Sequence, residues 1–163
     1  MLKDRFQLLL RYIRFYNKVT RNERSKSDKA AAIRDVWTMM DRNLSKGYKP
    51  SAAVIVDEQL FPFRGRTQFT QYMTNKPAKY GIKIFWCCCC ETAYPLRSMI
   101  YLRKQPDKER QQNVGAKVVL DLVGTYKGSG RNVTTDNFFT SLKLAETLRS
   151  WNLTLVGTVS RAI

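Results

Sequence analysis

The chain has 163 residues, a length that suits one domain with a modest core. It carries 29 Lys and Arg against 13 Asp and Glu, and a formal net charge of +16 favours a polyanionic partner. The absence of His excludes a Ser-His-Asp triad, a Cys-His pair and any His-ligated metal. Its longest uncharged run, Ser150–Ser160, is too short to cross a bilayer, so no membrane role is expected.

Residues 1–50 are predicted to form a helical segment. Their first apolar stripe has the i, i+3, i+4, i+7 spacing of one helix face, in Phe6, Leu9, Leu10 and Ile13. A polar stretch, Lys18–Lys26, interrupts that pattern. Asp28 then caps a second predicted helix, whose apolar face includes Trp37 and which Gly47 ends. Both stripes are interpreted as core-packing faces.

Residues 51–163 change to the pattern of a sheet. The β-branched run Ala52–Val56 predicts a buried strand that ends at Asp57. A basic loop rich in aromatic residues follows it. Residues 80–90 and 94–102 then predict two antiparallel strands joined by a turn at 91–93, and residues 106–113 a surface loop.

The rest of the chain alternates helices with strands. A helix is expected over residues 115–126, a strand over 131–135, and a helix over 140–151 that Thr140 or Ser141 caps. Residues 153–159 complete the pattern as an apolar strand. The whole is an α/β chain with a mixed five-stranded sheet and flanking helices.

All four cysteines are adjacent, at positions 87–90. Neighbouring side chains in a strand point to opposite faces, so these four cannot converge on one zinc ion. Intrachain disulfides between distant cysteines are excluded as well. We interpret the run as small apolar residues in a protein of a reducing compartment.

Asp57 and Asp136 occupy similar local positions, because each follows a predicted strand. If those strands are neighbours, the two carboxylates meet at one edge of the sheet and can recruit a hard cation such as Mg²⁺. The alternative is that Asp57 lies on a turn and Asp136 caps a helix. Spacing alone leaves both interpretations open.

Residues 59–90 contain no acidic side chain. Five basic residues alternate there with aromatic ones, as Arg64, Arg66, Lys76, Lys79 and Lys83 lie among Phe and Tyr side chains. Basic side chains neutralise phosphates and aromatic rings stack on unpaired bases. A solvated basic loop with its aromatic residues in the core is the alternative.

Residues 56–85 contain DEQ-x₄-RGR and NKP-x-KYGIK, and residues 131–159 contain DNFFTS. These two long blocks resemble piggyBac transposases and their domesticated derivatives. The stretches RFQLLLRYIRF and IRDVWTMM are also similar to that family. The resemblance covers nearly the whole chain.

The resemblance implies a partial ribonuclease-H-like fold over residues 51–163, with Asp57 and Asp136 as two members of a DDD catalytic triad. Those residues would bind Mg²⁺ or Mn²⁺. Arg64, Arg66, Lys76 and Lys79 fall in the motif and are assigned to DNA contact or site support. The implied activity is DNA strand cleavage and transfer at transposon ends, with TTAA targets, in the nucleus. The resemblance leaves open whether the chain forms a homodimer.

The position that would match the family's third catalytic Asp is not among residues 1–163. Asp121 lies in an apolar predicted helix, and Glu58 should face away from Asp57 if the strand continues. We therefore expect the chain to be a fragment of a transposase core whose catalysis is impaired. A domesticated or decayed derivative that binds DNA without catalysis is the alternative.

Overall fold

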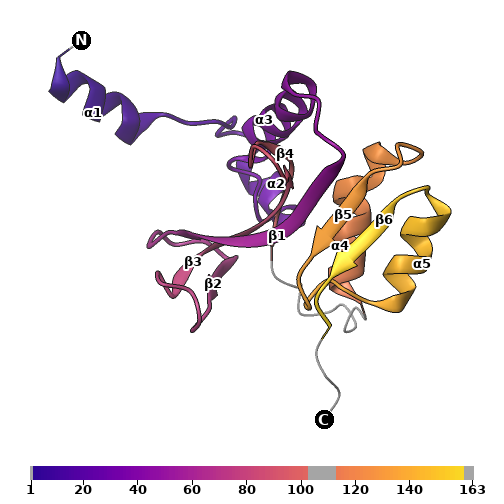
Figure 1. The fold of residues 1–163 in the computed structure, drawn as a ribbon. Helices are drawn as coiled ribbons and strands as arrows, with labels where there is room; N and C mark the ends of the chain where they lie inside the picture. The colour runs from indigo at the N-terminus through magenta and orange to yellow at the C-terminus, as the bar shows by residue number, and fades with distance from the viewer. Residues whose placement is uncertain (1, 103–112, 160–163) are drawn as a thin grey trace. The chain divides into compact units, whose positions relative to one another are not determined.

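The computed structural model describes residues 2–102 and 113–159 (Figure 1). The chain divides into two compact units, Met1–Met40 and Asp41–Ile163. The surface loop expected at 106–113 lies outside the described residues except for Asn113. Among the described residues, no helix is long and apolar enough to span a membrane.

The first unit contains α1 (Lys3–Tyr12), α2 (Arg21–Ser27) and the start of α3 (Arg34–Gly47). Helix α2 occupies the polar stretch that was expected only to interrupt the pattern. An ion pair one turn apart on α2, Lys26 to Glu23 at 2.8 Å, supports it without an apolar stripe. Helix α1, all of whose residues are described, buries none of them, so its stripe is not a core face here.

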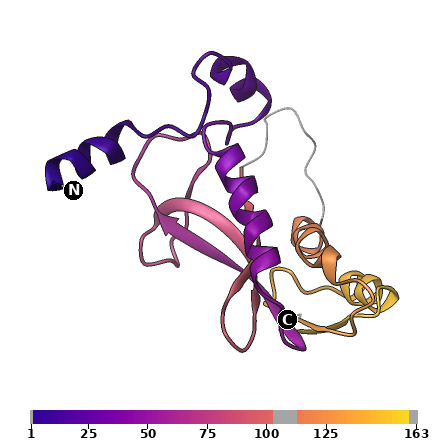
Figure 2. The same ribbon diagram turned by 90° about the horizontal axis from the view of Figure 1, so that it is seen from above.

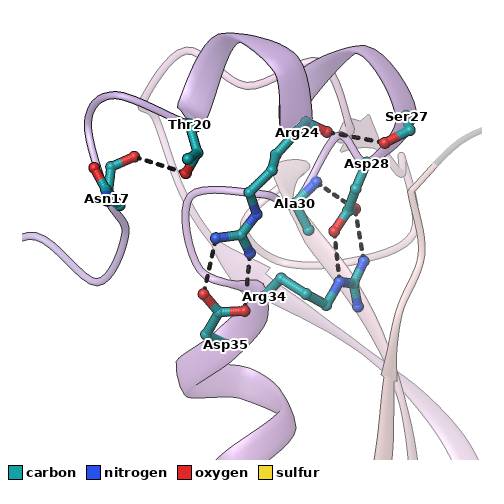
Figure 3. Close-up of polar contacts among 8 residues, drawn as sticks. All are labelled: Asn17, Thr20, Arg24, Ser27, Asp28, Ala30, Arg34 and Asp35. Carbon is teal, nitrogen blue, oxygen red and sulfur yellow. Dashed lines mark hydrogen bonds and ion pairs between the residues drawn. The ribbon is translucent and has the colours of Figure 1, made fainter.

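Two arginine–aspartate pairs link α2 to α3 within the first unit (Figure 3). The Arg24 guanidinium donates to both carboxylate oxygens of Asp35, at 2.8 and 2.9 Å. The Arg34 guanidinium donates to Asp28 at 2.7 and 2.8 Å and lowers the pKa of that carboxyl. Asp28 also accepts a hydrogen bond from the Ala30 amide at 2.9 Å and so begins the turn before α3. Helix α3 therefore starts later than predicted, at Arg34.

In the second unit, an antiparallel half of the sheet follows α3. Its strands are β1 (Ala53–Pro62), β2 (Thr70–Tyr72), β3 (Tyr80–Cys89) and β4 (Pro95–Ile100). Strand β1 does not end at Asp57. Strand β3 pairs with it from Val54 opposite Cys89 to Pro62 opposite Gly81, and this continuous ladder carries β1 five residues further.

The parallel half of the sheet is built from β5 (Asn132–Thr135) and β6 (Thr154–Gly157). Helix α4 (Val114–Val123), with a short 3₁₀ turn at Gly124–Tyr126, precedes β5, and α5 (Leu142–Ser150) joins β5 to β6. The strand order is β2-β3-β1-β5-β6, with β4 also paired to β3. The sheet therefore has six strands rather than five, because the three-residue β2 was missed.

Side chains from one sheet face and from two helices form the core of the second unit. Val54, Val56, Phe85, Cys87 and Cys89 are buried on that face and contact α4 and α5. Figure 2 shows these two helices side by side. Cys87 and Cys89 are buried in this core, as expected of small apolar residues, whereas Cys88 is half-buried and Cys90 is exposed; all four cysteines are free.

Ser141, one of the two predicted cap residues, is the N-cap of α5. Its backbone is extended, and its Oγ accepts a hydrogen bond from the Leu144 amide at 3.2 Å. Ser141→Ala should lower the free energy of unfolding by about 1 kcal/mol, because one amide at the helix start loses its acceptor. Urea denaturation checks this, and Ser141→Asp, which keeps an acceptor, should stay close to wild type. Equal losses in both variants would contradict the capping role.

Candidate functional site

The parallel pairing of β1 with β5 brings Asp57 and Asp136 together. The last paired residues are Val56 and Thr135, and each aspartate follows its strand's last partner directly. The two residues therefore leave the paired region at the same level of the sheet. One carboxylate oxygen from each of Asp57, Glu58 and Asp136 lies within 4.8 Å of the other two.

Glu58 was expected to face away from Asp57 and to supply no third acid to the site, yet one of its carboxylate oxygens lies near both aspartates. Alternation along a strand places neighbouring side chains on opposite faces. Pairing with β5 stops at Val56, however, so this edge of β1 is open beside Asp57 and Glu58. One Glu58 carboxylate oxygen lies within 4.8 Å of an oxygen of each aspartate, so a third carboxylate joins the cluster.

Local hydrogen bonds orient the two aspartates. The Glu58 amide donates to Asp57 Oδ1 at 2.7 Å, and the Phe138 amide donates to Asp136 Oδ1 at 3.1 Å. Asp57 lies inside β1 rather than on a turn. Asp136 begins the turn that leads to α5, whose cap is Ser141.

Gly157 at the end of β6 supports the backbone behind Asp136. Thr140 donates from its Oγ1 to the Asp136 carbonyl at 2.6 Å and exchanges a hydrogen bond with Thr135 at 2.8 Å. A Cβ on Gly157 would come 2.2 Å from Thr140 Oγ1. The glycine thus leaves room for the threonine that closes the Asp136 turn.

Two lysines lie beside the carboxylates. Lys76 forms an ion pair with Glu58 at 3.3 Å. Lys83 is half-buried, and its Nζ lies 4.9 Å from the ring centroids of both Phe85 and Phe138. Burial lowers the pKa of Lys83, while the carboxylates of the cluster act in the opposite direction.

Glu58 and Lys83 were not assigned to the site from the sequence, although a signal for them exists. Val54, Val56 and Leu60 are buried on alternate positions of β1, and Glu58 falls between them in the same series. Lys83 falls in the equivalent buried series of β3, before Phe85 and Cys87. A charge at a core-facing position needs a partner, which makes such a position a site candidate.

The other predicted DNA-binding residues lie further along the sheet. Arg64 and Arg66 are exposed in the segment after β1, and Lys79 is exposed in the turn before β3. Asp57 and Phe63 are six residues apart, or about 20 Å of extended chain. The structure therefore places Lys76 at the carboxylates, and Arg64, Arg66 and Lys79 on the basic segment beyond them.

The carboxylate cluster fits a hard divalent cation. Mg²⁺ takes oxygen ligands at about 2.1 Å, so two oxygens on opposite sides of it are about 4.2 Å apart. Oxygens that already lie within 4.8 Å of one another need only small side-chain rotations to reach that spacing. The chemistry of the donors and their spacing both suit Mg²⁺ or Mn²⁺.

A family model described as "Transposase IS4" matches residues 1–162. The human "PiggyBac transposable element-derived protein 3" is 30% identical over 139 residues, which are 82% of this chain and 23% of that protein. The human "Chimeric ERCC6-PGBD3 protein" is also 30% identical over 139 residues, and the match covers 13% of it. The chain thus spans less than a quarter of either relative.

A solved structure extends these similarities to the fold. The cryo-EM structure of a piggyBac transposase synaptic complex with hairpin DNA matches with a TM-score of 0.91 and 38% identity. That match covers 100% of this chain and 34% of the solved chain, and it confirms the expected ribonuclease-H-like fold. The chain belongs to the IS4-type transposase family, and its resemblance to piggyBac transposases is confirmed.

Proposed function

We propose that residues 51–163 form part of the catalytic core of a metal-dependent DNA transposase. Asp57 and Asp136 would hold a divalent cation, Mg²⁺ or Mn²⁺. The observation that supports this most directly is the convergence of their carboxylate oxygens within 4.8 Å at the end of the β1–β5 pairing. The similarity of the fold to that of a piggyBac transposase supports DNA transposition as the class of reaction.

A bound cation of this kind activates an attacking oxygen and stabilises a leaving oxygen in phosphoryl transfer. The residues of the chain supply the binding site. Asp57 and Asp136 concentrate negative charge, while the Glu58 amide and the Asp136 turn fix their orientation. Lys76 neutralises Glu58, and the ammonium of Lys83 adds positive charge beside the place where a phosphate would lie.

The proposed substrate is DNA, at transposon ends and TTAA targets, and the proposed location is the nucleus. Arg64, Arg66 and Lys79 would contact phosphates along the strand that leads to the carboxylates, with Lys76 at the site itself. The formal charge of +16 and the acid-free segment 59–90 support a polyanionic partner. A homodimer belongs to the same proposal.

Replacing both Arg64 and Arg66 with Gln should weaken DNA binding and flatten its salt dependence. Each lost phosphate contact reduces the slope of log K against log salt by about 1, so the double variant should lose about 2. Fluorescence anisotropy with labelled DNA at several salt concentrations measures this slope. The matched control is Lys143→Gln with Arg149→Gln, the same charge change at exposed positions of α5. Equal loss in the control would contradict the assigned contacts.

The alternative is a transposase derivative that binds DNA without catalysis. The observation that favours it is that one human relative is described as transposable element-derived. DNA binding that is indifferent to Mg²⁺ and to Asp57→Asn would support it. Binding that Mg²⁺ strengthens through Asp57 would support the catalytic core.

A further inference from the structure

A pocket lies at the end of the sheet beyond the carboxylates. It has a volume of about 420 Å³ and is lined by Phe63, Arg64, Gly65, Thr70, Ala78 and Tyr80. These residues come from the segment after β1, from β2 and from the start of β3. The pocket is distinct from the carboxylate site, which uses residues nearer the middle of β1.

Aromatic rings form one wall of the pocket and the surface beside it. Tyr80 is 58% exposed and pairs across the strands with Tyr72, with 4.7 Å between the ring centroids. Phe61 is 54% exposed on the same sheet face, because its partner Ile82 is two residues from Tyr80. Several large rings are therefore open to a ligand that can stack on them.

Gly65 also lines the pocket, in contact with the Phe63 ring. A Cβ at this position would come 2.4 Å from the Phe63 ring, so the ring lies directly against the Gly65 backbone. Glycine between Arg64 and Arg66 thus allows this close contact, and both arginines are exposed. The segment combines an aromatic surface with two cations, one on each side of the glycine.

The electrostatic surroundings select the ligand. Arg64 lines the pocket, Arg66 and Lys79 are exposed on the flanking segments, and residues 59–90 have no acidic side chain. A ligand with a flat apolar face and a negative charge satisfies both features. An unpaired nucleotide has that combination, because its base stacks on aromatic rings and its phosphate pairs with Arg or Lys.

The geometry points to this pocket as a binding site for one unpaired base of a DNA strand, with Tyr80 and Phe63 as the stacking residues. The inference rests on the proposed function, because the DNA strand concerned is the one that the basic segment would hold. Six residues of extended chain separate Asp57 from Phe63, about 20 Å, or about six base-pair steps of 3.4 Å. The bound base would therefore lie several nucleotides from a phosphate at the carboxylates.

The test compares a short single strand that carries one 2-aminopurine with a blunt duplex of the same sequence. Tyr80→Leu should weaken single-strand binding about tenfold, since stacking on one ring contributes that much, and should leave duplex binding unchanged. Tyr80→Phe keeps the ring and should bind like wild type. The 2-aminopurine emission should be quenched by wild type and Tyr80→Phe, and not by Tyr80→Leu.

Gly65→Ala is the second variant, because it displaces the Phe63 ring without touching the Tyr72–Tyr80 pair, and it too should weaken only single-strand binding. Tyr12→Ala, at a 65% exposed tyrosine of α1, is the matched control and should change neither. Equal effects on both probes, or no effect of Tyr80→Leu and Gly65→Ala, would overturn the pocket assignment. Failure to bind either probe would instead overturn the DNA-binding function.

Discussion

Asp57→Asn and Asp136→Asn should each weaken Mn²⁺ binding at least about tenfold, because an amide oxygen lacks the negative charge that a hard cation requires. The two residues meet only through the register of β1 with β5, so each supplies one side of the same site. Without a cation their charges repel each other. Removing either charge should therefore leave the metal-free protein at least as stable as wild type.

Isothermal titration with MnCl₂ on the 163-residue chain measures the affinity. Thermal unfolding with and without Mn²⁺ gives a second readout, since a ligand of the native state raises the midpoint. Asp121→Asn, the same change at an exposed position of α4, is the matched control and should keep wild-type binding. A metal-dependent shift that survives Asp57→Asn and Asp136→Asn would place the cation elsewhere.

The element types of the second unit could largely be predicted from periodicity. Alternating or continuous β-branched runs predicted β1, β3, β4, β5 and β6, and helical spacing predicted α4 and α5. These signals are local and strong because each element buries an apolar face. Strand β2 was missed, since three residues are too few to show a period.

The site depends on register, which local patterns do not contain. Asp136 could be placed after a strand and Asp57 next to the apolar run of β1, but their proximity depends on which strands become neighbours. The resemblance to a known family supplied that pairing. The contribution of Glu58 was missed for a related reason, because the proximity of its carboxylate to Asp136 also depends on the pairing of β1 with β5.

Composition supported the basic segment but not its internal arrangement. The absence of acidic residues over 59–90 indicated a polyanion, and the interleaved aromatic residues indicated stacking. The division between Lys76 at the carboxylates and Arg64 at the pocket follows from the turns around β2. Those turns are fixed by pairing with β3, which the alternation of this segment does not reveal.

Phe85→Ala should lower the free energy of unfolding by about 3–5 kcal/mol, the usual cost of removing a buried Phe side chain. Phe85 is 1% exposed on the core face of β3. Its ring packs edge-on against Phe139 at 5.8 Å and Tyr101 at 5.9 Å between centroids. Because Phe139 belongs to the turn after Asp136, the truncation removes packing beneath the carboxylate site as well as core volume.

Urea denaturation followed by circular dichroism measures the loss, and the metal titration repeated on the variant tests the connection to the site. Phe61→Ala, the same truncation at a 54% exposed position of β1, should cost less than about 1 kcal/mol. A small core is only marginally stable, so 3–5 kcal/mol is a large part of its total. If Phe85→Ala and Phe61→Ala were equally mild, the helices would not pack on this face as the structure shows.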